Sequence, residues 1–287
     1  MILTLSQEDL SLEFDPYAGG AVRAFRHRDL DILRPGPTRG GSTFDARQYA
    51  AFPMVPFIGR IHRGQFHADG RNVQLPANMP PEPHAIHGHG WQNTWTVETN
   101  SRDHAHLIYR HAGSEWPWSY YAAQSFKLSA NDLIIDLSVS NHAEQPMPSG
   151  IGWHPYFWRD GAHLQMPTTE LWTMDGITGA IAAKSVGADT DLSRGRAVSD
   201  LSIDAAFTVA NDPILMTWPT HRVTLTRDPV FGQAVLYVPD GEDYFCAEPI
   251  SHAPNAINSD LPSHQTGLRW LPPGETLSGR ITLSIER

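Results

Sequence analysis

The chain has 287 residues, and its 31 acidic side chains outnumber the 21 basic ones, which gives a formal net charge of -10. Nucleic-acid and anionic-membrane partners both require a basic face, so this balance argues against them. Cys246 is the sole cysteine, which excludes an internal disulfide and a CxxC metal site. The N-terminal residues carry acids where a secretory signal carries Lys or Arg, and no apolar run approaches the ~18 residues of a membrane span. We therefore expect a soluble, cytoplasmic protein.

In chain order, the predicted elements are strands. Residues 2–5 and 10–14 alternate apolar and polar side chains, and turn residues then lead into residues 21–25. That pattern is typical of a hairpin or meander. Residues 65–75 form another predicted hairpin, which turns at Asp69-Gly70, one of the stronger short turn signals.

Short apolar segments separated by turn residues continue to the C-terminus, and this rhythm is typical of antiparallel sheets. No amphipathic helix longer than two turns stands out, and residues 76–90 and 177–196 are predicted to be loops. The sequence therefore predicts an all-β protein, with stacked sheets in a single domain over residues 1–287. The further predicted strands are residues 95–99, 106–110, 120–128, 133–141, 164–167, 171–175, 206–210, 214–218, 222–227, 234–238, 244–247, 268–271 and 278–285.

The segment Phe245–Asn258 contains one carboxylate, Glu248, directly before Pro249. A residue that precedes proline is pushed into an extended conformation, so we expect Glu248 on a strand end or in a stiff loop. His154 stands before Pro155 in the same way. An extended Glu and an extended His form a candidate acid–base pair. The alternative that both are ordinary loop residues stays open at this point.

Fifteen histidines also raise the question of a metal site. His87 and His89, and likewise His104 and His106, are spaced so that both side chains of a pair lie on one face of a strand. Such a pair ligates zinc only when one or two further ligands converge on it, and the sequence cannot show convergence. A metal-dependent enzyme therefore remains an alternative. Glycine loops for phosphate and the GxSxG motif are both absent, which argues against nucleotide chemistry and a serine hydrolase.

Arginine and aromatic residues point instead to a sugar. Arginine and carboxylate groups hydrogen-bond sugar hydroxyls, and aromatic faces pack on the C–H face of a pyranose. Most of the nine tryptophans are expected to lie in the hydrophobic core. Trp153 and Trp158 flank His154 and are the best candidates for shaping a pocket.

With these segments in view, the chain resembles the aldose 1-epimerases, also called galactose mutarotases, along nearly its whole length. Six segments occur in the order typical of that family, and six in order are far more specific than any one. The segments are Gly59-Arg60-Ile61, Ile86-His87-Gly88, His154-Pro155-Tyr156-Phe157, Ile203-Asp204-Ala205-Ala206-Phe207, Glu248-Pro249-Ile250-Ser251-His252 and Leu271-Pro272-Pro273-Gly274-Glu275.

The resemblance implies a single large antiparallel β-sandwich of the galactose mutarotase-like type, with a sugar cleft on one sheet. It implies that Glu248 is the catalytic base, that His154 is the acid and that His87 is a second catalytic histidine. The substrate-binding arginine falls on Arg60 and the hydroxyl-binding aspartate on Asp204, while Trp153 is expected to line the pocket. No cofactor and no metal are expected. A small-molecule sugar is the expected partner, and a homodimer is left open.

The family often has asparagine where this chain has Gly59 and Trp153, so the chemistry is better supported than the identity of the sugar. We expect a mutarotase for a neutral, galactose- or glucose-like aldopyranose. One alternative is a 6-sulfonated or 6-phosphorylated sugar, bound by Arg63 or Arg159. Another is a non-catalytic sugar-binding protein. Free Glu titrates near about 4.3 and free His near about 6.5. We therefore expect an imidazolium whose pKa the carboxylate raises, and activity that falls below about pH 5.

Overall fold

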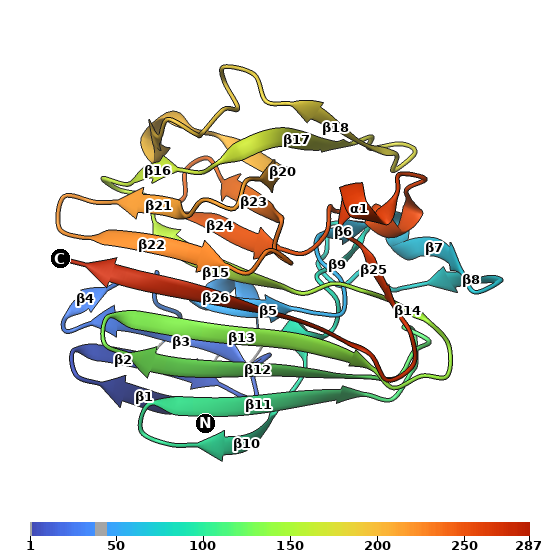
Figure 1. Ribbon diagram of the computed structural model, residues 1–287, viewed down its shortest axis with the longest axis horizontal. Helices are drawn as coiled ribbons and strands as arrows, with labels where there is room; N and C mark the ends of the chain where they lie inside the picture. Colours follow the sequence, from blue (N-terminus) through green and yellow to red (C-terminus); the bar gives the residue numbers. More distant parts are fainter. Residues whose placement is uncertain (1, 38–44) are drawn as a thin grey trace.

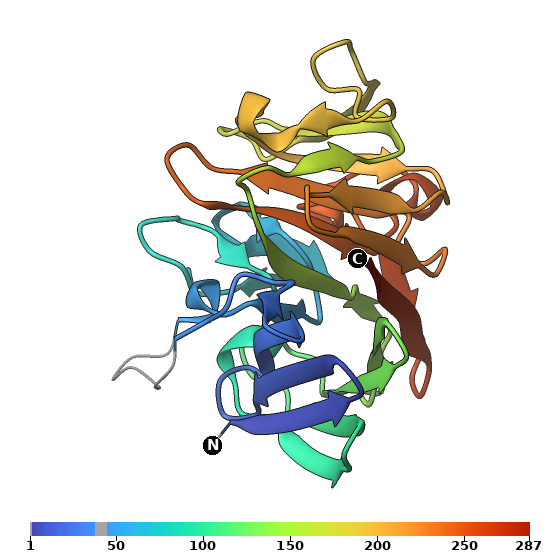
Figure 2. The ribbon, with the colours of Figure 1, turned by 90° about the vertical axis from the view of Figure 1, so that its left-hand side faces the viewer.

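The computed structural model describes residues 2–37 and 45–287, and nearly every element in it is a strand (Figure 1). Two large sheets contain most of the strands, and neighbouring strands in both sheets pair in the antiparallel direction. Both views show the yellow strands around β17 at one end of the molecule and the blue strand β1 near the other end (Figures 1 and 2). The predicted all-β, antiparallel fold class is confirmed.

The first sheet has eleven strands. In sheet order these are β1 (Leu3–Gln7), β2 (Leu10–Asp15), β3 (Ala21–His27), β5 (Ala51–Met54), β15 (Gly152–Trp158), β24 (Tyr244–Ile250), β23 (Gln233–Val238), β20 (Ile203–Val209), β17 (Thr168–Met174) and β18 (Ile181–Ser185), with β4 (Leu30–Asp31) beside β3.

The second sheet has nine strands. In sheet order these are β10 (Thr96–Asn100), β11 (His104–His111), β12 (Tyr120–Ser129), β13 (Asp132–Asn141), β26 (Thr276–Glu286), β22 (Arg222–Arg227), β21 (Ile214–Thr217), β16 (His163–Gln165) and β19 (Arg196–Ala197).

Three two-stranded pairs complete the strands: β14 (Met147–Ser149) with β25 (Arg269–Leu271), β6 (Arg60–Ile61) with β9 (Ala85–Ile86), and β7 (Gln65–Ala68) with β8 (Arg71–Gln74). The helical turns are η1 (Ala46–Gln48), η2 (His62–Gly64), η3 (Gly90–Gln92), η4 (Val198–Asp200), η5 (Ala256–Asn258) and α1 (Ser263–Thr266). Among the described residues, no helix is long and apolar enough to cross a membrane.

The main hydrophobic core joins the inner faces of the two large sheets. Strand β13 shows why these segments fold as strands, since every second side chain is buried along its whole length. Phe14 of the first sheet packs on Phe126 of the second, with their ring centroids 5.4 Å apart. One hydrophobic cluster contains residues of both sheets, as expected for sheets packed face to face.

Strands β5, β15 and β24 are buried on both faces, and their alternation separates two environments. Trp153 and Phe157 of β15 belong to the core between the sheets, while Tyr156 belongs to a second, smaller cluster. That second cluster also contains Phe52 of β5 and Cys246 of β24. Successive side chains of a strand point to opposite faces, so these three strands present a separate buried surface on the outer face of the first sheet.

Three details differ from the sequence predictions. Residues 76–90, predicted to be a loop, contain the short strand β9, which pairs with β6. Glu248 lies inside β24 rather than on a strand end or in a loop, because β23 pairs with this strand as far as Ile250. Residues 177–196, predicted to be a surface loop, contain β18, which pairs with β17. This edge strand buries little, so its sequence lacks the alternation by which strands are recognised.

Candidate functional site: a buried Glu–His pair on the outer face of the first sheet

His154 and Glu248 face each other across neighbouring strands. β15 and β24 pair at Gly152 with Ile250 and at Tyr156 with Cys246, and continuing this register inward puts His154 opposite Glu248. Between these two pairs the strands β15 and β24 do not pair, and Pro155 and Pro249 lie in this unpaired stretch. Proline has no N–H group for the ladder, so the two X-Pro steps interrupt the strand pairing beside His154 and Glu248.

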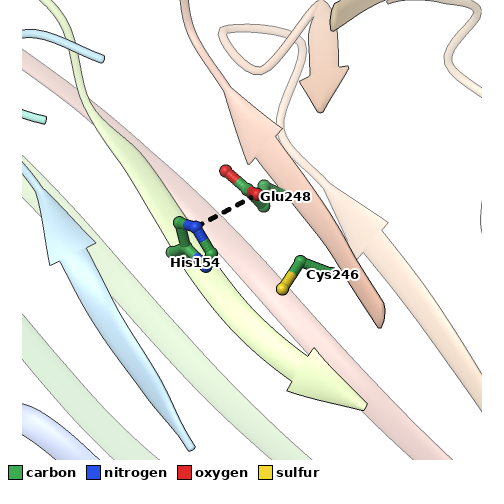
Figure 3. A group of neighbouring side chains, drawn as sticks. All are labelled: His154, Cys246 and Glu248. Atoms are coloured by element: carbon green, nitrogen blue, oxygen red, sulfur yellow. Dashed lines mark ion pairs between the residues drawn. The ribbon is translucent and has the colours of Figure 1, made fainter. Parts of the chain in front are cut away.

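The two side chains meet at this gap. His154 Nε2 lies 3.2 Å from Glu248 Oε1, and Figure 3 shows both groups pointing toward each other from their strands. His154 is 7% exposed and Glu248 1%. His154 Nδ1 and Glu248 Oε2 are buried without a protein hydrogen-bond partner. A buried polar atom without a partner costs about 1–3 kcal/mol, so these atoms indicate groups kept for a ligand rather than for stability.

Aromatic rings hold the imidazole of His154 in place. Its ring stacks on Phe52 at 4.5 Å and on Tyr156 at 4.9 Å between centroids. The rings of Phe52, Tyr156 and Trp91 belong to the smaller hydrophobic cluster. Stacking between these rings fixes the orientation of the His154 imidazole.

His87 approaches His154 from the loop after β9. The two rings meet edge to face, with centroids 5.4 Å apart. His87 has a left-handed backbone, with φ 59°, a conformation that is strained for a residue with a side chain. Gly88 follows at φ 69°, and a Cβ there would lie 2.1 Å from the carbonyl oxygen of Val55, so only glycine fits.

A backbone contact fixes the tautomer of His87. The N–H group of Gly59 donates to His87 Nδ1 at 3.2 Å, so Nδ1 is an acceptor and carries no proton. Burial lowers the pKa of His87 well below its usual value, and nearby His154 and Arg60 lower it further. His87 is therefore a neutral imidazole that carries its proton on Nε2.

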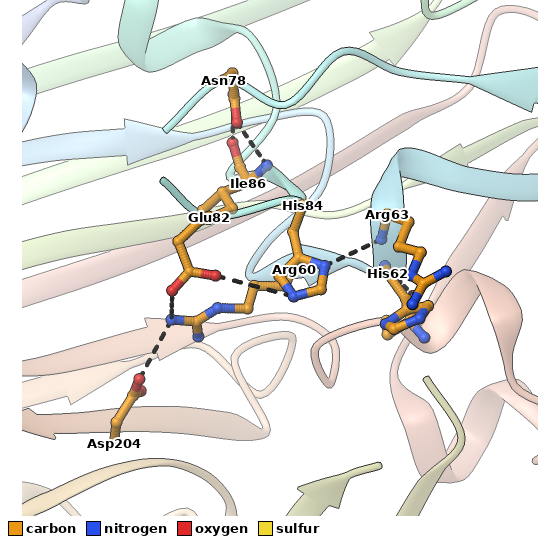
Figure 4. Close-up of polar contacts among 9 residues, drawn as sticks. Arg60, His62, Arg63, Asn78, Glu82, His84, Ile86 and Asp204 are labelled. Carbon is orange, nitrogen blue, oxygen red and sulfur yellow. Dashed lines mark hydrogen bonds and ion pairs between the residues drawn. The ribbon is translucent and has the colours of Figure 1, made fainter. Parts of the chain in front are cut away.

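Arg60 lies at the start of β6 and pairs with Ile86 of β9, next to His87 in the chain. Its Nη2 lies 3.4 Å from Asp204 Oδ2 and 3.4 Å from Glu82 Oε1, so its guanidinium extends between the two carboxylates (Figure 4). Burial lowers the pKa of Arg60, but the two carboxylates outweigh it and the net shift is upward. The guanidinium therefore stays charged.

The pKa values of the buried pair differ from the sequence expectation. Burial lowers the pKa of His154 to about 3, although a carboxylate lies beside it. Burial also raises the pKa of Glu248 well above its usual value, with a further rise from Asp204 and an opposing effect of Arg60. Desolvation disfavours the charged form of each group, and here it exceeds their mutual attraction. Burial therefore favours the neutral arrangement, with the proton on Glu248 and a neutral His154, over the ion pair.

Five of the six predicted site residues gather on this side of the first sheet: Glu248 and His154 at the centre, His87 at the edge of the His154 ring, and Arg60 with Asp204 beside them. Trp153 does not join them. It is fully buried in the core between the sheets, because it neighbours His154 in a strand and so points to the opposite face.

The two arginines considered for an anionic substrate have different surroundings. Arg159 donates to three backbone carbonyls, those of Pro239 at 2.8 Å, Leu201 at 2.9 Å and Ser199 at 3.5 Å. Arg63 is exposed, and its backbone N–H donates to His84 Nδ1 at 3.0 Å. Neither guanidinium forms a hydrogen bond or ion pair with Glu248 or His154 in the described part of the chain.

Sequence reasoning missed Glu82, which contacts Arg60, and it missed the aromatic neighbours Phe52 and Tyr156. Glu82 lies in a proline-rich loop that carried no motif, and only the pairing of β6 with β9 brings it to Arg60. Tyr156 could have been found from its position two residues after His154, since that spacing puts both side chains on one strand face.

Within the described residues, one group of three His, Cys, Asp or Glu side chains brings its ligand atoms within 4.8 Å of one another. The group is His154, Cys246 and Glu248, which Figure 3 shows together. No histidine of the two HxH pairs belongs to this group. His89 instead stacks on His111 at 4.9 Å between ring centroids, while His87 faces His154. Among the described residues, neither HxH pair therefore gathers the further ligands that a zinc site needs.

The fold and the site together define a class of protein: an all-β protein with a buried acid–base pair on one sheet face. Comparison with known proteins specifies the family. The family model described as aldose 1-epimerase matches residues 1–284. The chain belongs to the aldose 1-epimerase family, a family of isomerases, and a mutarotase-type function follows.

Individual relatives agree with this assignment. The uncharacterised protein YphB of Escherichia coli K12 is 28% identical over 303 aligned residues, which cover 99% of each chain. A solved structure from Escherichia coli K12, described as a candidate aldose 1-epimerase, has a TM-score of 0.88 at 28% identity and covers 100% of this chain and 99% of its own. A galactose mutarotase-like protein of Clostridium acetobutylicum has a TM-score of 0.89 at 18% identity, covering 100% and 95%. At that identity the likeness shows the fold alone.

Proposed function

We propose that this protein is a mutarotase for a neutral aldopyranose, in which Glu248 and His154 exchange protons with the sugar. The observation that carries the proposal is the 3.2 Å contact between His154 Nε2 and Glu248 Oε1 in a buried site next to Arg60 and His87. A sugar-binding protein without catalysis would have no need of a buried carboxyl with an unpartnered oxygen, which destabilises the fold.

Ring opening needs one base and one acid. The Glu248 carboxylate takes the proton of the C1 hydroxyl, a carbonyl forms at C1, and the C1–O5 bond breaks with its electron pair moving to O5. The His154 imidazolium gives its proton to O5. The C1–C2 bond of the open aldehyde then rotates. For closure on the other face, O5 attacks C1 and returns its proton to His154, while the carbonyl oxygen takes the proton back from Glu248.

The pair holds one proton throughout this cycle. In the cyclic sugar complex the proton is on His154, and in the open-chain complex it is on Glu248. Burial favours the second arrangement in the free protein, so the proton must pass from Glu248 to His154 before ring opening. A separation of 3.2 Å permits that transfer, and Arg60 favours it because its charge lowers the pKa of Glu248. Each positioned proton transfer accelerates the reaction by about 10²–10⁴-fold.

The other groups hold the sugar. We assign the Nε2 proton of neutral His87 to a sugar oxygen beside the reacting bond, and Arg60 and Asp204 to ring hydroxyls. A neutral sugar is favoured because Arg60 already contacts two carboxylates and Arg159 is occupied by three carbonyls. Arg60 and Arg159 are therefore not available as dedicated donors for a phosphate or sulfonate group, which such an anion needs.

The test is the rate of anomer exchange. Freshly dissolved α-glucose and α-galactose are followed by polarimetry, and the equilibrium exchange is measured by NMR, with and without protein. We expect acceleration by the wild type and by the control Glu286→Gln. Glu248→Gln should lose nearly all activity while binding sugar within about tenfold, because the amide keeps the shape but cannot take the proton. More than about a tenth of the wild-type rate in that variant would remove Glu248 from the base role.

A further inference from the structure

A loop between β8 and β9 carries a carboxylate to the edge of the site. Asn78 closes this loop on Ile86, since its Oδ1 accepts the backbone N–H at 2.8 Å and its Nδ2 donates to the carbonyl at 2.9 Å. Gln92 braces Asn78 in turn, with Nε2 donating to the Asn78 carbonyl at 3.0 Å. Ile86 pairs with Arg60 and precedes His87, so the loop is anchored directly on the site.

Glu82 lies within this loop, and its carboxylate points at Arg60 (Figure 4). Glu82 Oε1 and Asp204 Oδ2 both lie 3.4 Å from the same nitrogen, Nη2 of Arg60. A charge-assisted N–H···O bond normally measures about 2.7–2.9 Å, so neither carboxylate forms a tight fork with the guanidinium. The side chains of Glu82 and Asp204 are 35% and 47% exposed. Both therefore keep acceptor oxygens for a ligand.

The charges around this point are unequal. Glu82 and Asp204 share the Arg60 guanidinium, so these three groups together carry a net negative charge. The exposed Arg63 is a further cation on the His84 side of the loop. His84 also lies near, with Nε2 3.9 Å from Glu82 Oε2, and burial lowers its pKa, which disfavours its charged form. Charges a few ångströms apart interact more strongly near a protein surface than in water, because the effective dielectric constant is lower there. A ligand anion would be repelled here and a ligand cation attracted.

We infer that Glu82 is a specificity-determining residue of this site: with Asp204 it selects neutral aldopyranoses and those that carry an ammonium group, and it rejects anionic ones. The inference rests on the proposed mutarotase function and adds the substrate class. Glu82 accepts hydrogen bonds from hydroxyl groups of a neutral sugar. It accepts a charge-assisted hydrogen bond from the ammonium group of a 2-amino-2-deoxy sugar, which we expect to be the better substrate.

The experiment compares galactosamine, galactose and galactose 6-phosphate at about pH 6, where the sugar amine is protonated. Anomer exchange is measured by NMR and the dissociation constant by calorimetry, for the wild type, Glu82→Gln and Glu286→Gln. The last is a matched control, because Glu286 Oε2 also lies 3.4 Å from an arginine nitrogen, that of Arg222, and it is in the second sheet. It removes the same charge without touching the site.

We expect wild-type kcat/KM to be at least about tenfold higher for the amino sugar than for the phosphate, a difference of about 1.4 kcal/mol. Glu82→Gln should reduce this ratio about tenfold, and Glu286→Gln should leave it within about twofold. Equal ratios in Glu82→Gln and the wild type, or a wild-type preference for the phosphate, would overturn the inference. If no sugar is interconverted, the proposed function fails. In that case the charge preference is tested by the dissociation constants, with the same expected ratios between the amino sugar and the phosphate in the wild type and the two variants.

Discussion

His154 and Glu248 are directly opposite each other on antiparallel strands, between two registered pairs and beside the two prolines that interrupt the ladder. The side chains of such a cross-strand pair meet on one face of the sheet because their Cβ atoms lie about 4.5–5.5 Å apart. Strand register, rather than a flexible loop, therefore sets the 3.2 Å contact between the two groups. A rigid sheet is a precise support for a proton transfer.

The two histidines should differ in their effect on the rate. We expect His154→Asn to reduce kcat by about 10²–10⁴-fold, because O5 loses its proton donor. His87→Asn should cost less and should also raise KM, because neutral His87 orients the sugar by a hydrogen bond. The control is His163→Asn, at an exposed histidine of β16 in the second sheet. If His87→Asn reduced kcat more than His154→Asn, the acid would have to be reassigned to His87.

The activity should follow a bell-shaped pH profile with a low acid limb. Because burial lowers the pKa of His154 to about 3, the pair takes up a second proton only in strong acid. Because burial raises the pKa of Glu248, the pair loses its single proton, and with it the activity, at a higher pH than an ordinary carboxyl group would. The profile of kcat/KM, corrected for the uncatalysed rate, tests this. An acid limb near about pH 5 would show that Glu248 titrates as an ordinary carboxyl group.

Glu248→Gln should stabilise the protein, and more so as the pH rises. Below the pKa of the unfolded chain, both states hold the proton and the carboxyl has no pH-dependent effect. Above it, the unfolded side chain releases its proton while folded Glu248 retains it, so the wild type loses stability with rising pH until the raised folded pKa is passed. Each unit of the shift corresponds to about 1.4 kcal/mol.

The measurement is the difference in free energy of unfolding between Glu248→Gln and the wild type, from urea titrations at about pH 4 and about pH 7. The exposed Glu286→Gln control should show no such increase. A difference that is constant between the two pH values would contradict a raised pKa for Glu248.

Chelation should leave the rate unchanged, while added zinc should inhibit. The proposed mechanism needs free lone pairs on His154 and Glu248, and a zinc ion bound by these groups and Cys246 would occupy them. Cys246→Ala should raise the zinc concentration for half-inhibition about tenfold or more, because the thiolate is a strong zinc ligand. Activity that falls on chelation and returns with stoichiometric zinc would instead support a metal-dependent enzyme.

Much of the fold is a local property of this sequence. Alternation of apolar and polar side chains predicted most strands, since burial of one strand face leaves that period in the chain. The Asp69-Gly70 turn between β7 and β8 followed from turn chemistry, because Asp69 and Gly70 both have positive φ. The edge strand β18 was missed because an exposed strand needs no such pattern.

The candidate residues Glu248 and His154 were also readable, because a residue before proline is held extended whatever its surroundings. Their partnership was not, since it depends on the register between strands almost a hundred residues apart. The same register turned Trp153 away from the site and into the core. Glu82 reached Arg60 only through the pairing of β6 with β9. Burial, a property of the whole packed molecule, reversed the expected direction of the His154 pKa. Residue types and extended backbone were decided by the sequence alone, while proximity and desolvation were decided by the tertiary structure, because both depend on segments distant in the chain.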